Sequence, residues 1–177
     1  MKPKIQRHGE ILSLVRRHQF MSVDELAAAL LVRRRGSLRV ITNNIHVASI
    51  ASARTDYTVI ITSGVVRPLD GGITGVATVD FINQFKVDYA VMSTHGVESD
   101  GSLLDDDYKE VSVMQAMIAN ARVRFLGVDH SKFRSNALVR LGDITAFDKV
   151  FTDRLPDTAM QKMLKEAGVE CLIADAV

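Results

Sequence analysis

Apolar and polar residues follow two different periods along the chain, and these periods predict strands and helices in turn. Short segments rich in β-branched residues predict strands at residues 38–42, 57–62, 88–93, 123–128, 149–152 and 170–174. Between most of them, apolar residues recur every three or four positions and predict helices at residues 44–53, 76–85, 110–121 and 157–167. Alternating strands and helices are typical of parallel sheets. We therefore expect an α/β fold with a largely parallel sheet covered by helices.

The N-terminal residues show a helical pattern without strands. Residues 5–18 predict one helix, and Ser22 to Glu25 match a capping box that opens a second helix ending near Leu31. Two short helices joined by a tight turn begin a helix-turn-helix unit, and they also begin any helical hairpin. The apolar run from Leu38 leaves no room for a third, recognition helix. We expect a partial helix-turn-helix at residues 1–31 and the α/β domain at residues 32–177.

Charge is unevenly spread along the chain. Residues 1–40 hold nine Lys or Arg and three Asp or Glu, whereas the remaining residues hold 13 and 18. A basic segment on an acidic body indicates contact with polyanions, or merely a solvated basic arm. The single cysteine, Cys171, excludes an internal disulfide and a cysteine-based zinc site. With neither a signal-peptide pattern nor an apolar run of about 20 residues, we expect a cytoplasmic protein without membrane contact.

Polar or glycine-containing segments follow four of the predicted strands, at residues 42–44, 63–64, 94–96 and 129–132. Ligands of parallel α/β sheets bind outside the carboxyl ends of the strands, so these segments favour a ligand cleft. Lys132 is a point charge that suits a phosphate, with Arg67 as its competitor, although either could be an ordinary surface cation. Asn43 and Asn44 precede a helix, and one of them fits an N-cap.

Two further patterns have a structural interpretation and a functional one. A long loop is predicted from Gly96 to Tyr108. Its acidic residues suit the cap of the following helix better than a solvated face. A divalent cation is disfavoured, because the spacing of the carboxylates does not match an EF-hand. His130 beside Ser131 suggests nucleophilic catalysis, but neighbours in sequence need a third, orienting group to form a relay. We expect no metal, no cofactor and no catalytic residues.

Several short strings of residues form a recognisable set: Thr42-Asn43-Asn44, Asp70-Gly71-Gly72, Ser99 to Leu104, Asp107-Tyr108, Glu110-Val111, Asp129-His130-Ser131-Lys132-Phe133 and Thr152-Asp153. With these strings, the segment from Leu38 to Leu172 resembles the effector domain of DeoR-family transcriptional repressors. It is most similar to the branch that regulates glycerol 3-phosphate metabolism. Residues 7–30 resemble the first two helices of the family's DNA-binding domain.

The resemblance implies a fold related to ribose-5-phosphate isomerase and a phosphorylated sugar or polyol, such as glycerol 3-phosphate, as the effector. Carried over by position, it implies an effector site lined by Thr42, Asn43, Gly96, Glu98, Glu110 and Lys132. The sequence departs from the family pattern in lacking the recognition helix, the wing, and the first strand of the effector domain with its phosphate loop. A family lysine is also replaced by Met114. The missing recognition helix, wing and first strand predict an internal deletion.

The favoured hypothesis is therefore a transcriptional regulator by descent, with impaired specific DNA binding. One alternative is a sugar-phosphate-binding or interaction-only protein, which forms a homo-oligomer or associates with full-length relatives. An isomerase-like enzyme is a further alternative, with Glu110 as the base. Isomerisation needs a cation or oxyanion hole beside that base, and Met114 replaces the nearest cation, so we expect no enzymatic activity.

The first prediction concerns DNA. A basic head without a recognition helix can contact phosphates but cannot read base edges. Binding to duplex DNA should therefore be weak, independent of sequence and steeply weakened by added salt. Fluorescence anisotropy with a palindromic and a scrambled duplex at two salt concentrations measures both properties. Protection of one defined palindrome at physiological salt would contradict the prediction.

Overall fold

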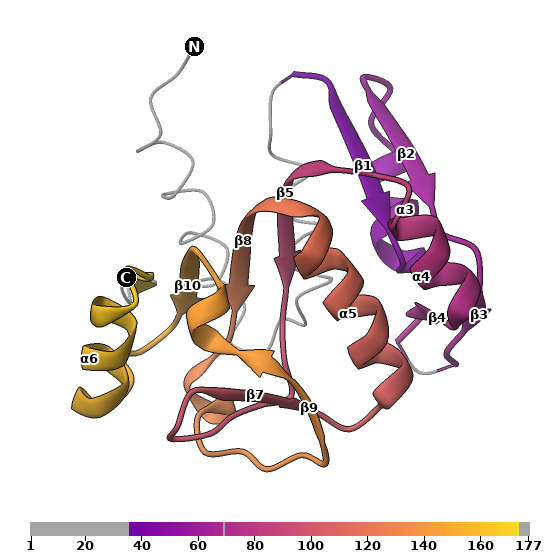
Figure 1. Cartoon of the computed structure of the whole chain (residues 1–177). Helices are drawn as coiled ribbons and strands as arrows, with labels where there is room; N and C mark the ends of the chain where they lie inside the picture. The colour runs from indigo at the N-terminus through magenta and orange to yellow at the C-terminus, as the bar shows by residue number, and fades with distance from the viewer. Residues whose placement is uncertain (1–35, 69, 174–177) are drawn as a thin grey trace. The chain divides into compact units, whose positions relative to one another are not determined.

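The computed structural model describes residues 36–68 and 70–173. The two predicted N-terminal helices, most of the basic head and the predicted boundary at residue 31 lie outside this part of the chain. The described residues divide into two compact units, with the division between Gln84 and Phe85. Figure 1 shows the elements of each unit along the colour gradient of the chain.

The first unit holds a strand-helix-strand motif followed by a short hairpin and a helix. Its elements are β1 (Leu38–Thr42), α3 (Ile45–Ser52), β2 (Tyr57–Ile61), β3 (Val65–Val66), β4 (Ile73–Thr74) and α4 (Val76–Ile82). Strands β1 and β2 pair in parallel, from Leu38 opposite Tyr57 to Thr42 opposite Ile61, whereas β3 and β4 pair antiparallel. The predicted parallel pairing across a helix is confirmed here.

Helix α3 begins directly after β1 because a polar side chain satisfies its first backbone donors. The Asn44 side-chain oxygen accepts hydrogen bonds from the backbone nitrogens of His46 and Val47, at 2.8 and 3.2 Å. The N-cap expected at Asn43 or Asn44 is therefore Asn44. Helix α4 ends at Ile82, three residues earlier than the sequence pattern predicts.

The second unit is built on a parallel sheet. Its elements are β5 (Val87–Met92), β6 (Gly96–Val97), β7 (Ser102–Asp105), α5 (Tyr108–Asn120), β8 (Ala121–Gly127), η1 (His130–Lys132), β9 (Val139–Asp143), η2 (Ile144–Ala146), β10 (Lys149–Thr152), α6 (Thr158–Glu166) and β11 (Glu170–Ile173). Strands β5, β8, β10 and β11 lie side by side in chain order, all parallel. The expected α/β fold with a largely parallel sheet is thus confirmed.

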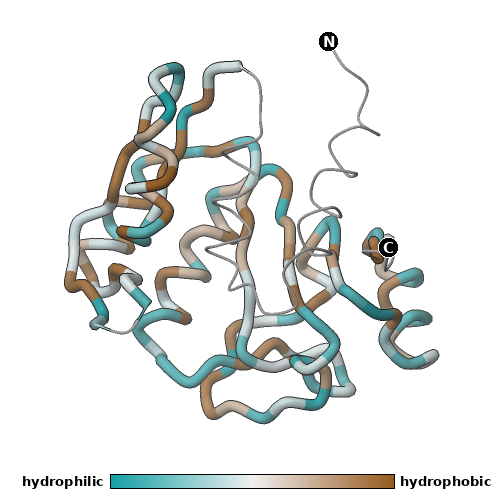
Figure 2. Tube along the Cα trace, turned by 180° about the vertical axis from the view of Figure 1, so that it is seen from behind, coloured by the Kyte–Doolittle hydropathy of each residue, from teal (hydrophilic) through white to brown (hydrophobic). Residues whose placement is uncertain are grey.

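Helices α5 and α6 bury apolar side chains against this sheet. Helix α5 packs along β5 and β8, and α6 packs along β11. Leu126 on β8 and Leu164 on α6 are completely or almost completely buried in one hydrophobic cluster. Figure 2 shows the contrast between the apolar strands and the hydrophilic segment that joins β7 to α5.

The segment after β5 differs from its prediction. Instead of a long loop from Gly96 to Tyr108, the chain forms β6 and β7, which pair antiparallel, and β7 also pairs with β9. Strand β6 has two residues, too few to show an alternation, and every residue of β7 is buried. The sequence therefore lacks the polar-apolar alternation by which half-buried strands are predicted.

The burial of Leu126 generates a stability prediction. Leu126→Ala should lower the free energy of unfolding by about 2 to 5 kcal/mol, because it removes buried methyl groups and leaves a cavity at a site with no exposed area. Leu138→Ala is the matched control, since Leu138 is 90% exposed, and it should change stability by less than about 0.5 kcal/mol. Urea denaturation followed by circular dichroism measures both. Equal losses in the two variants would show that β8 is not at the centre of the core.

Candidate functional site

Three strand ends of the second unit lie side by side at one edge of its sheet. Because β5, β8 and β10 are parallel neighbours, the residues that follow them emerge at the same edge. These are residues 93–96 after β5, 128–132 after β8 and 153–154 after β10. Of the seven predicted effector-binding residues, Gly96 and Lys132 lie in these segments, whereas Glu98 follows β6 and Glu110 lies in the first turn of α5.

Lys132 lies in a short turn that its neighbours hold in shape. Asp129 accepts a hydrogen bond from the backbone nitrogen of Ser131 at 2.8 Å, and its carbonyl accepts one from the backbone nitrogen of Lys132 at 3.1 Å. The Lys132 side chain is partly buried, and no carboxylate among the described residues forms an ion pair with it. It is therefore a cation available to an anionic ligand.

The structure also joins two residues that the sequence did not connect. Asp153, just after β10, accepts a hydrogen bond from the backbone nitrogen of His130 at 2.6 Å, and its other oxygen lies 2.5 Å from His130 Nδ1. Partial burial opposes ionisation of Asp153, but the hydrogen bonds from His130 outweigh this effect and lower the pKa of its carboxyl. The orienting group for His130 that the sequence lacked nearby is thus Asp153.

This pair does not complete a nucleophilic relay. In the described part of the chain, no hydrogen bond links the Ser131 hydroxyl to the His130 ring. A serine nucleophile needs such a contact with its base. The geometry therefore favours binding or positioning for His130.

Another backbone segment lies so close to Gly96 that a side chain would not fit at this position. A Cβ atom at Gly96 would overlap the carbonyl oxygen of Ser135. The backbone nitrogen of Arg134 donates to Val97 at 2.7 Å, so residues 133–135 lie against β6. From the sequence, this glycine could either allow a ligand to come close or form a turn. In the structure, the group that comes close is the backbone of residues 133–135.

Arg134 connects this segment to helix α6. Its φ of 68° lies in the left-handed region, and its guanidinium forms an ion pair with Asp157 at 3.0 Å. Asp157 is the N-cap of α6 and accepts a hydrogen bond from the backbone nitrogen of Met160 at 2.9 Å. This backbone hydrogen bond, followed by the one from Arg134, lowers the pKa of the Asp157 carboxyl.

The acidic residues before α5 cap the helix, as predicted. Asp107 is the N-cap and accepts from the backbone nitrogen of Lys109 at 2.8 Å, and Asp105 accepts from those of Asp106 and Asp107. Glu110 lies in the first turn of α5, where a negative charge is favourable. Glu98 begins the turn between β6 and β7, where its carbonyl accepts from the backbone nitrogen of Gly101 at 3.0 Å.

The other three predicted residues lie in the first unit, where hydrogen bonds occupy them. The Thr42 hydroxyl accepts from the backbone nitrogen of Asn44 at 3.1 Å. Asn43 is bonded to Ile73 through both its side chain and its carbonyl. Arg67 forms an ion pair with Asp70, and the hydrogen bonds in this pair lower the pKa of the Asp70 carboxyl. Arg67 therefore competes less well than Lys132 for an anion.

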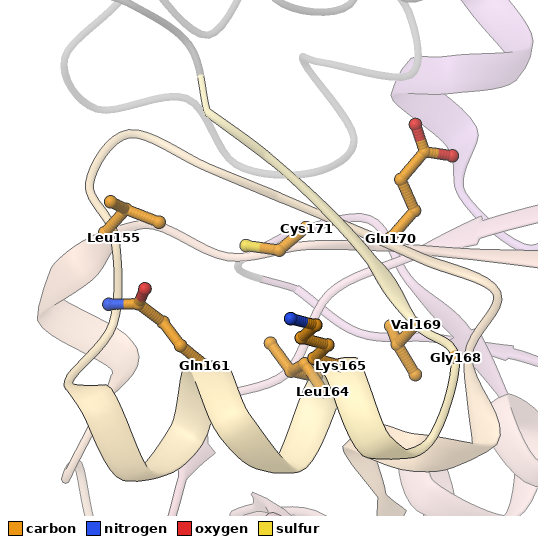
Figure 3. Close-up of a pocket in the computed structure, with 8 residues that line it drawn as sticks. All are labelled: Leu155, Gln161, Leu164, Lys165, Gly168, Val169, Glu170 and Cys171. Carbon is orange, nitrogen blue, oxygen red and sulfur yellow. The ribbon is translucent and has the colours of Figure 1, made fainter.

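An open depression of about 310 Å³ lies between α6, β11 and the preceding loop. Figure 3 shows its lining residues: Leu155, Gln161, Leu164, Lys165, Gly168, Val169, Glu170 and Cys171. None of the seven predicted effector-binding residues is among them. Burial raises the pKa of the Cys171 thiol, which disfavours the reactive thiolate.

The described residues form neither a metal-ligand cluster nor a membrane-spanning helix. No group of three or more His, Cys, Asp or Glu side chains in residues 36–68 and 70–173 is arranged to hold a metal ion. Within the same ranges, no helix has the length and apolar character needed to cross a membrane.

Comparison with known proteins identifies a family. The model of the DeoR C terminal sensor domain matches residues 20–154. The Glycerol-3-phosphate regulon repressor of Escherichia coli (strain K12) is 42% identical over 76% of this chain and 53% of its own length, and its Haemophilus influenzae counterpart is 38% identical over 78% and 53%. The HTH-type transcriptional repressor CsqR of Escherichia coli is 34% identical over 86% and 58%.

The chain spans about half the length of the glycerol-3-phosphate regulon repressors that it matches. Among solved structures, a chain of the tetrameric eIF2B-beta2-delta2 complex from C. thermophilum matches with a TM-score of 0.42 and 14% identity, over 73% of this chain and 45% of that chain.

The close approach at Gly96 generates the next prediction. Gly96→Ala should lower the free energy of unfolding by about 1 to 3 kcal/mol, because the new methyl group meets a backbone carbonyl that cannot rotate away. Gly142→Ala is the matched control in the same antiparallel sheet, since nothing lies within 4 Å of its Cβ position, and it should stay within about 0.5 kcal/mol. Thermal and urea denaturation measure the difference. A Gly96→Ala protein as stable as Gly142→Ala would mean that residues 133–135 do not lie against β6.

Proposed function

Because the chain belongs to the DeoR family through its C-terminal sensor domain, we propose that it is the sensing part of a sugar-phosphate-responsive transcriptional regulator. The proposed effector is a phosphorylated sugar or polyol, with glycerol 3-phosphate as the first candidate. That candidate comes from the names of the two glycerol-3-phosphate regulon repressors that the chain resembles.

The observation that carries the proposal is Lys132 at the carboxyl end of β8. A phosphate needs a cation at the strand ends, and Lys132 lies there without an ion-pair partner among the described residues. Gly96, Glu98 and Glu110 are proposed to shape the same edge of the second unit. Glu98 and Glu110 suit the hydroxyl groups of a sugar or polyol, since carboxylates accept hydrogen bonds.

Thr42, Asn43 and Arg67 remain proposed effector contacts of the first unit. Their hydrogen bonds support a positioning role more than a direct one, because each bond would have to be given up to a ligand. The glycines at positions 71 and 72 continue this loop, and the carbonyl of Gly71 accepts from the backbone nitrogen of Ile45 at 3.0 Å. The loop is therefore tied to the start of α3.

We also propose that the chain binds its effector without transforming it. The relatives are repressors by name. Met114, at the position where the family carries a lysine, is buried in the hydrophobic cluster, so this position adds no cation beside Glu110. Weak, sequence-independent DNA binding and self-association or pairing with full-length relatives remain part of the proposal.

The test is a matched pair of lysine variants. Lys132→Ala should weaken the binding of glycerol 3-phosphate about tenfold, which corresponds to about 1.4 kcal/mol. Lys162→Ala is the control, because Lys162 is exposed on α6 and its contact with Glu166 is a surface ion pair of 3.8 Å. Isothermal titration calorimetry measures both affinities. Equal dissociation constants would reduce Lys132 to a surface charge, and absence of binding by the unmodified chain would refute the proposed effector.

A further inference from the structure

The His130 ring is fixed at the strand ends in an unusual way. One carboxylate, that of Asp153, binds both the backbone nitrogen and the ring Nδ1 of His130. The two residues follow neighbouring strands, β8 and β10. The ring is half exposed, and no described residue forms a hydrogen bond with its Nε2. Its orientation is therefore set on one side while the other side is open to a ligand.

This contact determines where a neutral His130 carries its proton. Asp153 is ionised near neutral pH, because its pKa is lowered, so it can only accept a hydrogen bond. The proton of a neutral ring must then lie on Nδ1, where Asp153 accepts it. Nε2 is left with a lone pair, which attracts a hydroxyl group but repels an anionic oxygen.

The fixed charges of this edge also oppose an anion. They are six negative and three positive when the histidines are neutral. The charged and titratable groups are Asp129 and Lys132 beside His130, Asp153 and Arg154 after β10, the Arg134–Asp157 pair leading into α6, the His95–Asp106 pair, and Glu98 and Glu110, which are proposed to shape this edge. An anion would therefore be bound more favourably if the edge gained one positive charge.

We propose that His130 takes up a proton when an anionic ligand binds at this edge, and that its Nε2 then donates a hydrogen bond to the ligand. The inference rests on the proposed function, since it takes the phosphate group of the effector as the anion. Asp153 compensates the new charge on the ring. Binding is thus linked to pH: the contribution of His130 to affinity rises as pH falls, because its ring holds one more proton in the complex than in the free protein.

Calorimetry in buffers of different ionisation enthalpy counts the protons taken up. The probe is glycerol 3-phosphate at pH 7.5, bound to the unmodified chain, His130→Gln and His46→Gln. The phosphate group contributes its own proton change equally to all three, so the difference between the chains isolates His130. His46→Gln is the control, because it changes an exposed ring in the other unit. We expect the unmodified chain and this control to take up more protons on binding than His130→Gln does.

The pH dependence of affinity gives the second readout. Between pH 8 and pH 6.5, the dissociation constant of the unmodified chain should fall with a slope that His130→Gln lacks, of at most about tenfold for each pH unit. Binding by His130→Gln with the same proton uptake and the same slope as the unmodified chain would overturn the inference and leave the proposed function intact. Absence of binding by the unmodified chain would refute both.

Nuclear magnetic resonance keeps the inference testable if His130→Gln fails to fold. Nitrogen chemical shifts of the unmodified chain at pH 7.5 should show the Nδ1-protonated neutral ring without ligand and a doubly protonated ring with saturating glycerol 3-phosphate. A ring that stays neutral in the saturated complex, or that carries its proton on Nε2 in the free protein, would overturn the inference.

Discussion

Parallel pairing of β5, β8, β10 and β11 is the constraint on which the candidate site depends. A parallel strand can follow its neighbour only after a crossover, so every strand leaves the sheet at the same edge. Spatial order follows chain order here, and segments far apart in sequence are brought to one edge. The His130–Asp153 contact is a direct result, because it links the ends of two adjacent strands, 23 positions apart.

The same edge also needs polar residues for reasons unrelated to a ligand. Each helix or turn that begins after a strand exposes backbone nitrogens, and short side chains satisfy them. Asp107, Asp129 and Asp157 all do so, and Asn44 does the same for α3 in the first unit. A cap of this kind stabilises by about 1 kcal/mol, which is sufficient reason for the residue to be present. Lys132 and the open side of the His130 ring remain after these roles are assigned.

This division explains what could be predicted from the sequence. Strands β1 and β10 have the predicted bounds because their apolar residues are local signals, and the caps of α3 and α5 follow from residues next to each helix. The overlap that fixes Gly96 depends on residues 133–135, and β7 pairs with β9; both partners lie far along the chain. Asp153 likewise shows no sequence feature that selects His130 as its partner. Tertiary contacts, unlike caps, leave no pattern at short spacing.

The distribution of charge shows why a ligand-linked proton suits this edge. Arg134 already has a carboxylate partner, so an anion could use it only by breaking an ion pair, whereas Lys132 and Arg154 form no ion pair with a described carboxylate. Exposed pairs of this kind contribute up to about 1 kcal/mol, and a ligand that replaces one loses that contribution. A further permanent cation would avoid this cost, but it would repel Lys132 and Arg154 in the free protein. A histidine that becomes charged only with the ligand present adds a positive charge without that repulsion, because the anion arrives together with the proton.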